Sequence, residues 1–137
     1  MASDSDYRHY PDVFRVVQSV TTAGDTSTPS VIKFDLYQDG VPMTTRPALR
    51  FWICNDGTYA NSTNATIAPT SGEGTTIVTH TSTKDLSIRA DASKTSISVS
   101  VTDGSAETVT LRWAPAEFGS MPFNATAAEV DITHAAP

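Results

Sequence analysis

The sequence predicts an all-β antiparallel sandwich, and three observations support this. Thr and Ser supply 36 of the 137 residues, a composition that suits strands and turns. Apolar and polar residues alternate with period two in several short segments, and none shows the apolar period of a helix. Turn residues separate about seven to nine such strands, which indicates a sandwich rather than a βαβ fold. The length fits one domain.

The N-terminal residues read as an arm outside this domain. Residues 1–12 are rich in Ser and Asp and end at Tyr10-Pro11, so we expect a short flexible arm followed by one domain over residues 13–137. The first strand begins at Val13 and ends in a turn cluster that contains Gly24.

The clearest alternation lies in residues 31–38, where Ile32, Phe34 and Leu36 share one face. This pattern predicts a half-buried strand. Asp39-Gly40 then predicts a chain reversal into a strand over residues 48–54. Residues 51–54 of that strand are all apolar, so we expect both of its faces to be at least partly covered.

The second half of the chain continues the strand pattern. Residues 58–74 are polar and punctuated by Gly and Pro, which predicts a long loop. Asp103-Gly104 lies between two strongly alternating segments and predicts a hairpin. The strands expected after the loop cover residues 75–81, 85–90, 95–102, 107–113 and 128–133.

Composition argues against several classes of partner. The net charge of −6 is opposite to what phosphate backbones attract, so we expect no nucleic-acid binding. The sequence shows neither a secretory leader at its start nor an apolar run long enough to span a membrane.

Cys54 is the only cysteine, so an intrachain disulfide is excluded, and we expect this residue to be a small buried apolar group.

Local signatures of catalysis and of metal binding are missing from the sequence. No Gly-x-Ser-x-Gly motif is present, and His9, His80 and His134 have no nucleophile or acid at a diagnostic spacing. The turns with Asp before Gly lack the repeated acids of a calcium loop, and the His and Cys residues lack the spacing of a zinc site. We therefore expect no enzymatic activity, no catalytic residue, no metal and no cofactor.

Aromatic and apolar side chains in unexpected places suggest a partner interface. Tyr37 and Trp52 lie opposite the core faces of their strands, so either a loop of the same chain or a partner must cover Trp52. The segment over residues 114–127 is too apolar for an ordinary solvated loop. The candidate interface residues are Tyr7, Tyr10, Pro11, Tyr37, Trp52, Phe118, Met121 and Phe123.

Residues 31–57, VIKFDLYQDGVPMTTRPALRFWICNDG, resemble the opening hairpin of bacterial immunoglobulin-like domains. The Thr-rich strand, the alternating strands, the Asp-Gly turn and the closing segment EVDITHAAP are similar to small virion proteins of tailed bacteriophages built on that domain. The resemblance spans about residues 30–134 and is a pattern of strands and turns. Residues 1–12 match no part of it.

The resemblance implies an immunoglobulin-like sandwich that acts as a non-enzymatic virion structural protein, with head decoration (cement) as its first role. The implied partners are the major capsid protein and further copies of this chain. The implied location is the capsid exterior, after a soluble stage in the host cytoplasm. Two alternatives stay open, a tail-associated accessory protein and an adhesin or carbohydrate-binding module in which Tyr37, Trp52 or Tyr59 stacks on sugar rings.

Overall fold

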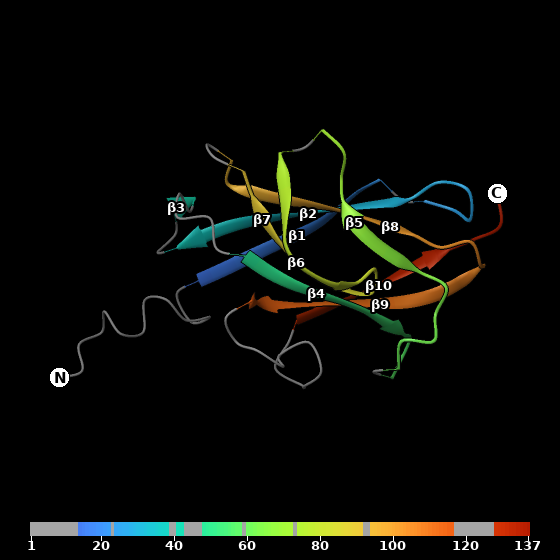
Figure 1. The fold of residues 1–137 in the computed structure, drawn as a ribbon. Coiled ribbons are helices and arrows are strands. Elements are labelled where there is room, and N and C mark those ends of the chain that lie inside the picture. The colour runs from blue at the N-terminus through green and yellow to red at the C-terminus, as the bar shows by residue number, and fades with distance from the viewer. Residues whose placement is uncertain are drawn as a thin grey trace.

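The computed structural model describes residues 14–22, 24–38, 41–42, 48–58, 60–72, 74–91, 94–116 and 128–137. These residues form strands joined by turns and short loops (Figure 1). The strands are β1 (Phe14–Thr22), β2 (Ser30–Gln38), β3 (Val41–Pro42), β4 (Ala48–Asn55), β5 (Thr66–Pro69), β6 (Thr75–Ser82), β7 (Asp85–Ala90), β8 (Ser96–Thr102), β9 (Glu107–Pro115) and β10 (Ala128–His134).

Two antiparallel sheets make up the sandwich, as the sequence predicts. One sheet has the order β1-β2-β8-β5, with the short β3 paired to β2, and the other has the order β10-β9-β4-β7-β6 (Figure 1). The first order is that of the A-B-E-D sheet of immunoglobulin domains, and β10-β9-β4 corresponds to G-F-C. The hairpin β6–β7 extends the second sheet beyond β4, so β6 forms one edge and β10 the other.

Alternating apolar residues of both sheets fill the space between them. Ile32, Phe34 and Leu36 of β2 are buried, which confirms the face predicted for that strand. The ring of Phe34 packs edge-on against those of Phe51 and Trp113, with centroids 5.0 and 4.9 Å apart. These contacts join β2 of one sheet to β4 and β9 of the other, so the aromatic cluster holds the two layers together.

The chain reversal predicted at Asp39-Gly40 is confirmed, because β2 pairs antiparallel with β3 and Gln38 lies opposite Val41. Two strand pairings expected from the sequence are wrong. Residues 31–38 and 48–54 do not pair, because β2 lies between β1 and β8 whereas β4 lies in the other sheet. Strands β8 and β9, which flank Asp103-Gly104, also belong to different sheets. Gly104 lacks the positive φ of a tight two-residue turn, and Asp103 is buried. The segment between β8 and β9 therefore carries the chain across the sandwich.

The region expected to be one loop, residues 58–74, contains the strand β5. Its four residues, which end in Pro69, pair with β8 at the edge of the first sheet, where a proline is tolerated. With β5 and the two-residue β3, the described residues contain ten strands, slightly above the seven to nine expected. Both additions are too short to show an alternation in the sequence.

Candidate interaction surface

Strand β6 forms an open edge of the second sheet. It pairs with β7 on one side, and no described strand pairs with it on the other. Seven of its eight residues are exposed. Its neighbour across the sandwich, β5, meets this hairpin at its turn, where the N–H of Ile67 donates to the carbonyl of Thr83. Within the described residues, the first half of β6 is therefore the part that has no neighbouring strand on its outer side.

This edge has no charged residue and no proline. Soluble proteins protect edge strands with charged side chains, proline or bulges, and residues 75–82 (TTIVTHTS) contain two bulges but no Lys, Arg, Asp, Glu or Pro. Ile77 and Val78 are 41% and 45% exposed, and they are the exposed large apolar side chains among those that the structure describes. The opposite edge, β10, presents the exposed acids Glu129 and Asp131.

Two irregularities shape β6. The pairing with β7 shifts register between Ile77 and Thr79 and again between His80 and Ser82. The first shift inserts Val78 into the edge strand as an extra residue, and the second inserts Thr81. Such bulges re-aim side chains and increase the local twist. Both inserted residues line the pocket described next, so the bulges give β6 a contoured surface instead of a flat edge.

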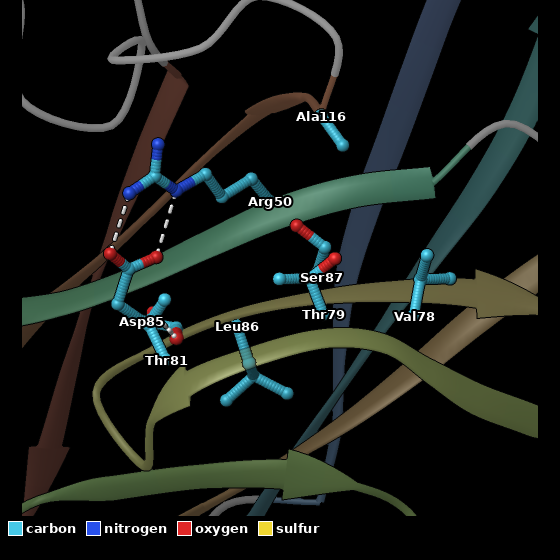
Figure 2. Close-up of a pocket in the computed structure, with 8 residues that line it drawn as sticks. All are labelled: Arg50, Val78, Thr79, Thr81, Asp85, Leu86, Ser87 and Ala116. Carbon is cyan, nitrogen blue, oxygen red and sulfur yellow. Dashed lines mark hydrogen bonds and ion pairs between the residues drawn. The ribbon is translucent and has the colours of Figure 1, made fainter.

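A shallow pocket of about 310 Å³ lies beside β6 on the outer face of the second sheet (Figure 2). Its polar part is an ion pair in which Arg50 Nε donates to Asp85 Oδ1 at 2.8 Å and Nη2 donates to Oδ2 at 2.6 Å. A hydrogen bond to a carboxylate favours the charged guanidinium, so this pair raises the pKa of Arg50. The remaining lining residues are Val78, Thr79, Thr81, Leu86, Ser87 and Ala116.

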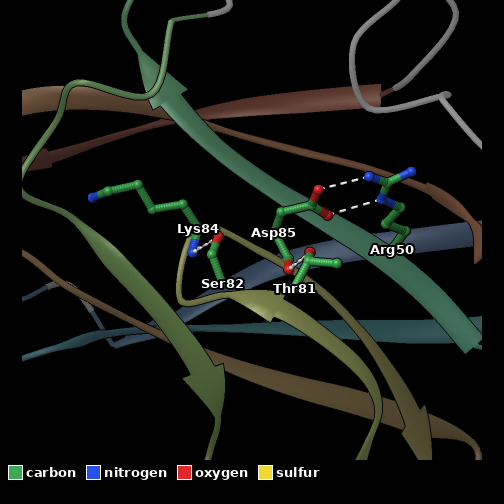
Figure 3. A network of polar contacts seen from close by, with 5 residues as sticks. All are labelled: Arg50, Thr81, Ser82, Lys84 and Asp85. Atoms are coloured by element: carbon green, nitrogen blue, oxygen red, sulfur yellow. Dashed lines mark hydrogen bonds and ion pairs between the residues drawn. The ribbon is translucent and has the colours of Figure 1, made fainter.

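Hydrogen bonds fix the turn between β6 and β7 below this pocket (Figure 3). Thr81 Oγ1 donates to the carbonyl of Asp85 at 2.6 Å, and the N–H of Lys84 donates to Ser82 Oγ at 3.1 Å. Lys84 Nζ also donates to the carbonyls of Thr63 and Ala65 at 2.6 and 2.7 Å. The hairpin that carries the open edge is thus anchored to the segment before β5.

Trp52 is buried by its own chain, with 6% of its surface exposed. It lies on the outer face of β4, where its partners in register are Asp85 of β7 and Arg112 of β9. Cys54 on the same face is fully buried, as expected, and its Sγ lies 3.5 Å from the carbonyl of Thr110. Burial raises the pKa of this thiol to about 11. Both faces of β4 are covered, as its apolar run predicts.

The other interface residues expected from the sequence divide into two groups. Tyr37, near the end of β2, is half-buried and lies in the first sheet, away from the β6 edge. The structure therefore does not bring Tyr37 and Trp52 together on one surface. The residues that lie outside the described ranges are Tyr7, Tyr10, Pro11, Phe118, Met121 and Phe123.

A Ser–His contact that no local motif reveals lies at one end of the sandwich. Ser30 Oγ and His134 Nε2 are 3.1 Å apart, and the N–H of Gly24 donates to the same Oγ at 2.9 Å. The residues stand 104 positions apart in the chain and belong to different sheets. Ser30 is 2% exposed and His134 is 1% exposed. The hydroxyl is enclosed, so the contact joins the sheets without presenting a nucleophile at the surface.

Two carboxyl groups lie at the same end. Asp103 accepts the N–H of Ser105 at 2.9 Å through Oδ1, and its buried Oδ2 has no hydrogen-bond partner when the carboxylate is ionised. Burial raises the pKa of Asp103, and interaction with Glu107 raises it further. Burial alone would raise the pKa of Glu107, but hydrogen bonds from Thr63 and Asp103 and from a backbone N–H outweigh it and lower that pKa. When the two carboxyl groups hold one proton between them, that proton therefore lies mainly on Asp103.

The described ranges show no arrangement typical of a metal centre. None of their His, Cys, Asp and Glu side chains form a group of three or more that could hold an ion. A second hollow of about 240 Å³ on the outer face is lined by acids, including Glu129 and Asp131. No helix in this part of the chain is long and apolar enough to cross a membrane.

No family model, curated protein or solved structure matches this chain. Function must therefore be inferred from the fold and from the surface of the described residues. Sequence reasoning missed the β6 edge. The sequence did carry a signal for this edge: residues 75–82 have no charged side chain and include two adjacent β-branched apolar residues, Ile77 and Val78.

Proposed function

We propose that this chain is a non-enzymatic structural protein of a tailed-phage particle, and that it decorates and stabilises the head. The observation that carries the proposal is the open, uncharged β6 edge with exposed Ile77 and Val78. An edge of this kind favours pairing with another protein chain, which is why soluble proteins usually block it. The enclosed Ser30 hydroxyl supports a role without catalysis.

The physical basis of decoration is linkage. A protein that binds only the assembled shell shifts the assembly equilibrium towards that shell, in proportion to its affinity and concentration. The net charge of −6 keeps free copies apart and favours docking onto a basic patch. Many weak contacts on a repeating surface together produce a large stabilisation.

The carbohydrate-binding alternative has less support. Stacking on a sugar requires an aromatic face that is open to solvent, and the Trp52 side chain is almost fully covered. Tyr37 is half-buried, and Tyr59 lies outside the described residues. The tail-accessory alternative uses the same protein-binding surface and differs from head decoration in copy number.

Quantitative mass spectrometry of washed particles tests the proposal. A head decoration protein is present in hundreds of copies, at a fixed ratio to the major capsid protein. A few copies per particle would indicate a tail accessory instead, and absence from washed particles would overturn a virion role. Binding to a glycan array that disappears in Trp52→Ala would favour the adhesin alternative.

A further inference from the structure

The open half of β6 has a surface that suits one occupant, a second copy of the same strand. We infer that two copies of this chain pair antiparallel through β6, so that their second sheets form one continuous sheet. This inference deepens the proposed function, since it names a copy of the chain as one protein partner, and its test uses the purified chain alone.

Charge favours a second copy at this edge over the opposite one. A two-fold interface places each surface against itself, so any acid at its centre faces an identical acid. At β10, pairing centred on Val130 would place the exposed Glu129 of each copy opposite the exposed Asp131 of the other. Strand β6 has no formal charge, and the exposed Arg89 and the half-buried Asp91 at the end of β7 have opposite signs. Pairing at β6 therefore adds no like-charge contact at the interface to the overall repulsion between two acidic copies.

The β5 edge of the first sheet is less suited to pairing than β6. Strand β5 has four residues and ends in Pro69, which has no N–H to donate to a new strand. In β6 the segment Thr75–Ile77 keeps regular pairing geometry ahead of the first bulge. Self-pairing would therefore use these residues for backbone hydrogen bonds and would cover the apolar side chains of Ile77 and Val78.

The interface is small, so the association should be weak. One strand edge covers much less than the ~800 Å² per partner that is typical of a stable complex. We expect monomers at about 10 µM and dimers at about 1 mM, a range in which neighbouring copies on one particle would still pair because they are held close together.

Sedimentation equilibrium of the full chain over that range tests the inference. The expected result is a mass that rises towards the dimer, with an association weakened about tenfold or more in Ile77→Lys and Val78→Lys. The matched control is Ala68→Lys, which adds the same charge at the exposed β5 edge and should leave the dimer unchanged. A mass that stays monomeric at the highest concentration would overturn the inference, and so would a dimer that survives both β6 variants.

Crosslinking provides a second test that does not depend on disrupting the edge. Single cysteines at Thr76, Ile77, Val78 and Thr79 should include at least one that lies near the two-fold axis and forms an interchain disulfide under mild oxidation. Cys54 is fully buried and should form no interchain disulfide. Ala68→Cys is the control. If no β6 cysteine forms more interchain disulfide than the Ala68→Cys control, antiparallel self-pairing is contradicted. The proposed function would stand apart from this result, because it is tested by the copy number on particles.

Discussion

Replacing Asp103 by Asn should stabilise the protein at neutral pH. Asp103 is 1% exposed, one of its carboxylate oxygens is unbonded, and burial and interaction with Glu107 raise its pKa. Asn keeps the Oδ1 atom that accepts the N–H of Ser105, and its amide nitrogen can donate towards Glu107 as a protonated Asp103 would. An unsatisfied buried polar group costs about 1–3 kcal/mol, so we expect the free energy of unfolding to rise by about 1–2 kcal/mol at pH 7.

The pH dependence follows from the direction of the shift. A pKa that is higher in the folded state means that ionised Asp103 disfavours folding, and this cost disappears as pH falls through the folded-state value. The advantage of Asp103→Asn should therefore be largest near pH 7 and vanish near about pH 4, close to the pKa of an unfolded aspartate. Urea unfolding followed by circular dichroism at several pH values measures both quantities.

The control for Asp103→Asn must remove the same charge elsewhere. Asp25 lies at the surface, and hydrogen bonds from the N–H and hydroxyl of Ser27 lower its pKa, so Asp25→Asn should not stabilise the protein at pH 7. An equal gain in Asp25→Asn would show that relief of the net negative charge is the cause. A variant Asp103→Asn that is less stable than the wild type, or whose gain is independent of pH, would refute the reasoning.

Two further predictions concern the interior. Cys54 should not react with Ellman's reagent in the folded protein at pH 8 and should react in urea, because the thiol is buried and its pKa is about 11; rapid reaction without urea would contradict this. Gly24→Ala should destabilise by several kcal/mol in urea unfolding, since a Cβ would lie 2.1 Å from the carbonyl oxygen of Thr28. Gly104→Ala has open space and should unfold almost as the wild type does.

The periodicity of the sequence predicted which residues face the core but not which strands pair. Alternation in β2 identifies Ile32, Phe34 and Leu36 as inward-facing whatever its neighbours are. Pairing depends on the path of the chain between sheets, and Asp103-Gly104 shows this clearly. The dipeptide is a strong hairpin signal, yet it connects two strands of different sheets, and its Asp103 is buried whereas its Gly104 is exposed.

The candidate surface was hidden for a related reason. The lack of charge in residues 75–82 is visible in the sequence, but only the strand order shows that this strand is an edge. The contact between Ser30 and His134 likewise depends on the closure of the sandwich, since nothing near either residue indicates the other. By contrast, the apolar run at residues 51–54 was sufficient to predict that both faces of β4 are at least partly covered, although it left open whether this chain or a partner covers Trp52.

Thermal stability of particles that lack this chain, measured with and without the purified protein added back, tests the decoration role most directly. If the chain binds the assembled head and stabilises it, the temperature of head disruption rises with added protein and levels off at a fixed number of bound copies. Heads whose disruption temperature stays the same while the protein remains unbound would contradict the proposed role.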